Sequence, residues 1–187
     1  MDGLKWNNQR APDFMRQNMF YNGWTHSHYI TNIIVFCPDG TILIMCYNAP
    51  GMMNDSSVAH AGNVYRKLED LYYNHGFKCV VDSAFSKQEF PFLIKSSQLD
   101  LDDNEMLVVN CIATSLRLSA EWGMGELHAT FPRMKETFRY HEGGERKVGL
   151  KLMLHLFNYR SRRVGINQLL STYMPRLNDT RDNIIQQ

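Results

Sequence analysis

A Pro-Asp-Gly turn between two β-prone runs is the feature that most constrains this chain. The turn, at residues 38–40, separates residues 29–36 from residues 41–47, and both runs are rich in β-branched residues. A turn of this type between two such runs is typical of a β-hairpin. We therefore expect two neighbouring antiparallel strands here, preceded by a polar, irregular segment over residues 1–20.

Apolar residues recur at helical spacing in three later stretches, with short apolar runs between them. The predicted elements are a helix over residues 56–73, strands over residues 77–81 and 92–95, a long helix over residues 104–131 and a helix over residues 148–159. Asp55 or Ser56 is expected to cap the first helix. A hairpin followed by a helical crossover into another strand implies an α/β domain with a mixed sheet.

Composition excludes several classes of protein. The chain has 187 residues, of which 44% are hydrophobic and 21% charged, and this is typical of a folded domain. Its 20 basic and 19 acidic residues nearly cancel, which excludes a strongly basic, histone-like DNA binder but leaves room for a local basic face. No apolar run approaches the ~20 residues that span a bilayer. The four cysteines lack the paired spacing of a zinc site, so we expect reduced, buried thiols.

Two carboxylates stand out by their position. Asp82 follows a short apolar run, and the carboxyl end of a buried strand is where open α/β sheets place their sites. Glu121 lies in an apolar turn of the long helix, where glutamate is rarely found without a partner. Each residue also has a purely structural explanation: Asp82 would initiate a turn, and Glu121 would form an ion pair with Arg117 one helical turn earlier. The alternative is that both bind one divalent cation.

Other charged residues have simple structural explanations as well. Asp2 lies at the start of the sequence, where a frayed end is expected, and Asp55 is in position to cap a helix. Clustered carboxylates raise each other's pKa values unless a cation neutralises them, and such oxygen ligands suit Mg²⁺ or Mn²⁺. Arg160, Arg162 and Arg163 would contact DNA phosphates or simply complement a helix dipole.

Several segments, in this order along the chain, carry a resemblance. They are Asp2-Gly3-Leu4, residues 21–24 and 35–42, residues 48–56, residues 80–85, residues 117–124 and residues 156–168. Together they resemble the nuclease domain of Harbinger-type transposases, which are DDE superfamily endonucleases. The resemblance implies an RNase H-like mixed sheet flanked by helices, with the first strand largely missing, because the family has a strand that leads into its first aspartate.

The resemblance also implies site residues and an activity. Asp2, Asp82 and Glu121 would be the catalytic triad that binds Mg²⁺ or Mn²⁺ and hydrolyses DNA phosphodiester bonds. Asp55, and Asn54 where the family usually has histidine, are candidate accessory residues. The candidate phosphate contacts are Arg117, Arg160, Arg162 and Arg163.

The expected organisation follows from the same resemblance. Residues 1–140 would form the nuclease domain, residues 141–174 helices packed on it, and residues 175–187 a polar tail. DNA is the expected partner, the nucleus the expected location, and a separate protein would supply DNA-recognition helices if the chain is N-terminally truncated. Two alternatives stay open, namely a catalytically inactive transposase remnant that binds DNA or a protein, and an unrelated small α/β binding protein.

Overall fold

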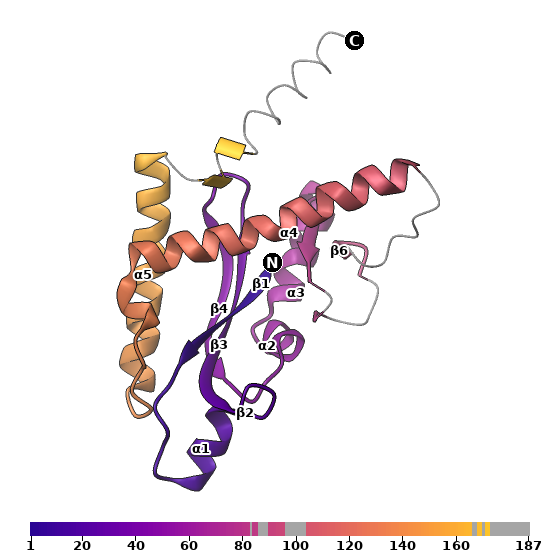
Figure 1. Ribbon diagram of the computed structural model, residues 1–187. Helices are drawn as coiled ribbons and strands as arrows, with labels where there is room; N and C mark the ends of the chain where they lie inside the picture. The colour runs from indigo at the N-terminus through magenta and orange to yellow at the C-terminus, as the bar shows by residue number, and fades with distance from the viewer. Residues whose placement is uncertain (83, 86–89, 96–103, 166–167, 170, 173–187) are drawn as a thin grey trace.

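The computed structural model describes residues 1–82, 84–85, 90–95, 104–165, 168–169 and 171–172 (Figure 1). The strands are β1 (Asp2–Asn7), β2 (Tyr21–Asn22), β3 (Ser27–Phe36), β4 (Ile42–Pro50), β5 (Cys79–Val81) and β6 (Leu93–Lys95). The helices are α1 (Phe14–Phe20), α2 (Asp55–Ala61), α3 (Val64–His75), α4 (Asn104–Thr130), the 3-10 helix η1 (Pro132–Lys135) and α5 (Gly143–Val164). The α/β class is confirmed, and the arrangement is consistent with an RNase H-like fold. The expected polar tail, residues 175–187, lies outside the described residues.

Strand β3 is the centre of the main sheet. β1 pairs with it antiparallel from Asp2 opposite Ile34, and β4 pairs antiparallel along its other edge. The predicted hairpin is thus confirmed, and Gly40 supplies the positive φ of +79° that its turn requires. The short β2 extends the sheet beside the start of β3, while β5 and β6 form a separate parallel pair.

A bulge links the three long strands. Two residues of β4, Tyr47 and Asn48, stand opposite Asn32 of β3, and Asn48 takes a φ of +65°. The side-chain amide of the fully buried Asn32 donates from Nδ2 to the Leu4 carbonyl at 3.0 Å, and its Oδ1 accepts from the Asn48 backbone N–H at 2.9 Å. Because both ends of this side chain are satisfied, it holds β1, β3 and β4 in one register.

The two faces of β3 pack against different helices. Ile33 and Val35 contribute to a core with α2, α3 and β5. Ile30 and Ile34, on the opposite face, pack with residues of α4, η1 and α5. Figure 1 shows this layering, with α5 on one side of the sheet and α2 and α3 on the other.

The expectation of an irregular segment over residues 1–20 is wrong. β1 alternates buried Leu4 and Trp6 with exposed Lys5 and Asn7, which is the two-residue period of a strand with one buried face. Helix α1 follows, and the Asp13 carboxylate caps it by accepting from the Arg16 amide at 3.0 Å. The strand contains only two large apolar residues, so its polar composition concealed it.

The single helix expected over residues 56–73 is divided into α2 and α3. Gly62 and Asn63 separate them, and Asn63 takes a left-handed φ of +54°. Gly62 packs against the Cys46 side chain so closely that a Cβ would clash with its sulfur. This close approach, rather than local helix propensity, determines where α2 ends.

Helix α4 ends before Pro132, as predicted. One side of this helix exposes apolar residues to solvent. Cys111, Ile112 and Leu118 are exposed, so the expectation of uniformly buried cysteines is wrong. Cys79 is buried, Cys37 and Cys46 are half-buried, and all four thiols are free. None of the helices in the described part of the chain combines the length and apolar character needed to cross a membrane.

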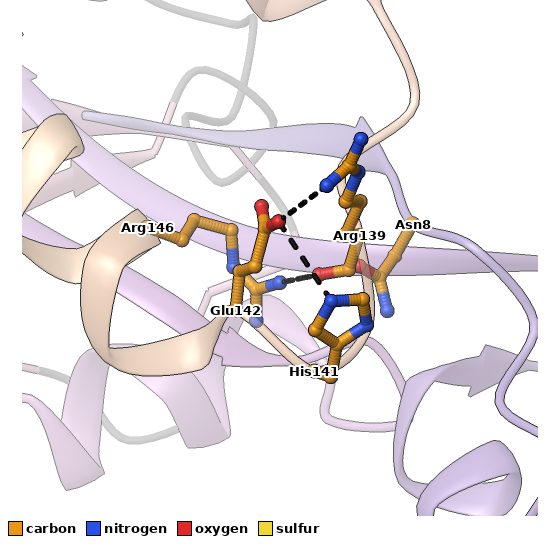
Figure 2. A network of polar contacts seen from close by, with 5 residues as sticks. All are labelled: Asn8, Arg139, His141, Glu142 and Arg146. Atoms are coloured by element: carbon orange, nitrogen blue, oxygen red, sulfur yellow. Dashed lines mark hydrogen bonds and ion pairs between the residues drawn. The ribbon is translucent and has the colours of Figure 1, made fainter.

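Helix α5 is joined to the sheet by a buried arginine. Arg146 donates from Nη1 to the Arg139 carbonyl at 2.7 Å and to the Asn8 side-chain oxygen at 3.3 Å (Figure 2). It also donates from Nε to the Asn48 side-chain oxygen at 2.6 Å. The helix expected over residues 148–159 is longer at both ends, and Gly143 and Gly144 lie in its first turn. The side-chain amide of Asn48 donates to the Gly143 carbonyl at 3.2 Å. The contacts of this turn to the sheet therefore compensate for the low helix propensity of glycine.

Candidate metal centre

The ends of β1 and β5 are joined beside the first candidate aspartates. The backbone nitrogen of Met1 donates to the Val80 carbonyl at 2.7 Å, although these residues are 79 positions apart. Asp2 is the next residue after this contact, and Asp82 follows β5 directly. The sheet therefore brings together two aspartates from opposite ends of the first half of the chain.

Asp55 joins them from the start of α2. The structure corrects the predicted cap, because Asn54 caps the helix by accepting from the Ser57 amide at 2.7 Å. The Asp55 carboxylate is thereby left to lie over Gly3 of β1. A Cβ on Gly3 would approach the Asp55 oxygens to 2.5 and 2.9 Å, so the site requires a residue without a side chain here. The Asp-Gly pair in the sequence gave no indication of this role.

Burial and mutual repulsion act on these carboxylates. Burial raises the pKa of Asp2, the Gly3 amide and the positive charge of the Met1 nitrogen lower it, and the charges of Asp82 and Asp55 add to the increase. The pKa of Asp55 is also raised by burial, against the opposing effect of Lys5, and the charge of Asp82 raises it further. These shifts show a desolvated site in which negative charges face one another.

One oxygen of this site has no partner. Asp55 Oδ1 is buried and accepts no hydrogen bond from any described residue. A buried, unpaired carboxylate oxygen is costly, and a cation would satisfy it. Carboxylate oxygens are the ligands that Mg²⁺ and Mn²⁺ favour, so Asp2, Asp55 and Asp82 fit such an ion by donor type.

Glu121 is placed differently. It lies on an exposed side of α4, where its Oε1 is 3.5 Å from Arg117 Nη1, and this is the ion pair expected from sequence. The hollow that it lines is formed by α4 and residues 165, 168 and 171, and neither Asp2 nor Asp82 is among its described lining residues. Within the described part of the chain, no three His, Cys, Asp or Glu side chains are arranged to hold one metal ion. The structure thus places Asp2, Asp55 and Asp82 near enough for their charges to interact, although not in the arrangement of a formed metal site, and it does not bring Glu121 to them.

The candidate phosphate-binding arginines differ in their availability. Arg160 Nη1 is 2.8 Å from Glu126 Oε1, so this side chain, like Arg117, is engaged in an ion pair. Arg162 and Arg163 are exposed in the last turn of α5, and the Arg163 guanidinium lies 5.6 Å from the centre of the Tyr159 ring. Arg162 and Arg163 are therefore the two that solvent, or a phosphate, reaches most readily.

Comparison with known proteins gives the family of the chain. A family model described as DDE superfamily endonuclease matches residues 1–156, a segment that contains all three aspartates and Glu121. Searches of curated proteins and of solved structures each found no significant match. The family match removes the interpretation as an unrelated α/β binding protein. Since the matched segment covers most of the chain, this protein belongs to the DDE superfamily endonucleases.

Proposed function

We propose that the protein is a metal-dependent DNA endonuclease of the Harbinger transposase type. The observation that carries this proposal is the convergence of Asp2, Asp55 and Asp82 in a desolvated site, from three segments far apart in the sequence. The positive charges nearby, on Lys5 and on the Met1 nitrogen, act on these carboxylates more weakly than burial does. Here the largest effect on both Asp2 and Asp55 is burial, which is the condition of carboxylates arranged for a cation that binds later.

Each residue has a role in this proposal. Asp2 and Asp82 would hold the divalent cation, and Asp55, whose carboxylate lies against Gly3, would contribute its unpaired oxygen. When bound, the metal activates a water molecule and stabilises the leaving oxygen of the phosphodiester. Asn54 serves the site indirectly, since its capping of α2 leaves the Asp55 carboxylate available.

Glu121 completes the set only after its ion pair opens. Its pair with Arg117 is long, at 3.5 Å, and Glu121 is about half exposed. Exposed pairs of this kind contribute about 0.2–1 kcal/mol, so separating the two side chains costs little. Arg117 would then be free to contact DNA, together with Arg162 and Arg163 on α5. A DNA substrate would place the protein in the nucleus.

Cleavage and metal binding test the proposal in parallel. Wild-type protein should nick DNA with Mg²⁺ or Mn²⁺, and Asp82→Asn should abolish the nicking. The same ions should raise the thermal stability of wild type, by about 2.7 kcal/mol at a hundred times the dissociation constant, and leave Asp82→Asn unaffected. Asp70→Asn is the matched control, since Asp70 is an exposed aspartate on α3 and its change should alter neither property. Equal nicking by wild type and Asp82→Asn would contradict the proposed chemistry.

A second candidate function is an inactive remnant that keeps the fold and binds DNA or a protein. The placement of Glu121 on the exposed side of α4, paired with Arg117, favours this alternative. It predicts DNA binding that weakens with salt, because phosphate contacts release counterions, but that does not depend on divalent ions. Binding of this kind with no cleavage, and with no stabilisation by Mg²⁺ or Mn²⁺, would decide for the remnant.

A further inference from the structure

We propose that Trp6 and His128 form a positioning pair, which fixes α4, the helix that carries Glu121, against β1, the strand that carries Asp2, and which holds only while the imidazole is neutral. The effect on DNA cleavage rests on the proposed function. The structural part of the inference does not, and it has a readout of its own.

The pair is a buried, directional contact. Trp6 is only 2% exposed, and its Nε1 lies 2.9 Å from His128 Nε2. The two rings are 6.5 Å apart and inclined by 56°, and the Phe138 ring lies 6.0 Å from the indole on another side. An indole N–H can only donate, so His128 Nε2 must accept and the ring proton must be on Nδ1. A doubly protonated imidazole has no acceptor to offer, and the bond would be lost.

The location of the pair makes it a determinant of site geometry. Trp6 lies four residues after Asp2 on β1, and His128 lies seven residues, about two helical turns, after Glu121 on α4. Leu127, next to His128, packs in the same apolar cluster as Trp6, but apolar contacts alone allow a helix to rotate and slide. The hydrogen bond is directional, so it selects one rotation of α4 and therefore one direction for Glu121.

A second contact limits α4 between Glu121 and His128. The Phe36 ring of β3 approaches Gly123 so closely that a Cβ there would lie 2.8 Å from two ring carbons. Gly123 brings the helix close to the sheet, and the Trp6–His128 bond sets its rotation. Together, the two contacts fix the part of α4 that begins two residues after Glu121.

The charges around His128 favour its neutral form. Burial lowers the pKa of His128, and the positive charge of Lys135 in η1 lowers it further. The ring of β1 that contacts the imidazole is the neutral Trp6, and the neutral Phe138 packs on the indole. On the same half of α4, the acidic Glu121 and Glu126 are engaged by arginines. The folded-state pKa therefore lies below 6.5, so the pair is intact above pH 6.5 and is lost as the pH falls through the folded value.

Nuclear magnetic resonance of the full chain tests the pair directly. The Trp6 indole N–H signal, assigned by its absence in Trp6→Phe, should move on acidification together with the His128 ring signals, with one midpoint below pH 6.5. In His128→Gln, whose side-chain oxygen accepts but does not titrate, the indole signal should stay constant over the same range. An indole signal that ignores pH in wild type, or a His128 midpoint at or above 6.5, would overturn the inference whether or not the protein cleaves DNA.

Kinetics test the positioning role. His128→Leu should lower kcat for metal-dependent cleavage by about tenfold or more, with KM for DNA unchanged, because small displacements of a catalytic group are costly. His128→Gln should restore kcat to within about twofold of wild type and remove the loss of activity at acidic pH. Equal kcat in wild type and His128→Leu would refute the positioning role. Absence of cleavage in wild type would count against the proposed function instead, and the indole signal would still decide the existence of the pair.

Discussion

Buried charges lie at both ends of β1, but they differ in sign and in the number of hydrogen-bond partners. Just after its last residue, the Asn8 oxygen and two other neutral oxygens surround the Arg146 guanidinium, which is only 7% exposed. At its first residue, Asp2 faces Asp55 and Asp82, and Asp55 Oδ1 has no partner among the described residues. One end is a cation supplied with acceptors, and the other is a group of anions with few donors.

This difference separates a structural contact from a candidate functional site. Burial lowers the pKa of Arg146, but arginine stays charged, and its neutral partners hold α5, β4 and the segment after β1 in place. At the aspartate end, the Gly3 amide and the charge of Lys5 only partly offset the burial, and the pKa values of Asp2 and Asp55 stay raised. Sites that bind ligands often carry such local destabilisation, and the rest of the fold must compensate for it.

The largest expected effect comes from removing the cation. Arg146→Met should lower the free energy of unfolding by about 3 kcal/mol, because one buried and two partly buried acceptors lose their donors while the methionine keeps part of the apolar volume. Chemical denaturation followed by circular dichroism would measure the change.

Arg139→Ala is the matched control for this prediction. It removes an exposed side chain that pairs with Glu142 at 3.0 Å, but it keeps the backbone carbonyl that accepts from Arg146. It should therefore cost less than about 1 kcal/mol. Similar losses in the two variants would show that Arg146 contributes as an ordinary surface charge, and the comparison between the two ends of β1 would fail.

At the other end of β1, removing a charge should change the free energy of unfolding in the opposite direction. Asp55→Asn should raise the free energy of unfolding at pH 7, by less than about 1 kcal/mol after solvent screening, since burial disfavours the ionised carboxylate. Because the folded-state pKa is raised, the ionised form destabilises the protein above that value, and acidification towards the ordinary value of 3.8 relieves the penalty.

The difference in stability between wild type and Asp55→Asn should therefore shrink between pH 7 and pH 4. Any contribution of His128 is common to both proteins and cancels in this difference. Denaturation curves at several pH values would provide the measurement. A difference that is independent of pH, or a variant less stable than wild type at pH 7, would show that Asp55 has a stabilising partner.

Regular patterns in the sequence predicted much of this fold. The hairpin around residues 38–40, the strand before Asp82 and the long helix that ends before Pro132 all depend on local periodicity and turn chemistry, and the structure contains each of them. β1 was missed because it owes its place to pairing with β3 and has only two buried apolar side chains. The division between α2 and α3 depends on contact with Cys46, which no local pattern encodes.

The candidate site shows the same limit. Asp82 was noticed from its place at a strand end, and the Arg117–Glu121 pair from its helical spacing. Asp55 was given a capping role that Asn54 performs instead, since either residue type caps well and only tertiary contacts distinguish them. Proximity of Asp2 to Asp82 depends on a hydrogen bond across 79 positions, which is beyond the reach of any sequence window.

The smallest effect on stability should come from Gly3→Ala, which leaves every charge in place. The new Cβ would occupy the space of the Asp55 carboxylate, so that side chain must turn away from Asp2 and Asp82. Alanine in a strand gains about 0.5–1 kcal/mol over glycine, which offsets the displacement and leaves the net stability nearly unchanged. Stabilisation by Mg²⁺ or Mn²⁺ should nevertheless weaken, because one oxygen donor is lost from the site. Gly23→Ala, at a glycine with open space around it, should leave both properties as in wild type. If Gly3→Ala keeps the full response to metal ions, Asp55 is not part of the site, and the aspartate end of β1 reduces to Asp2 and Asp82.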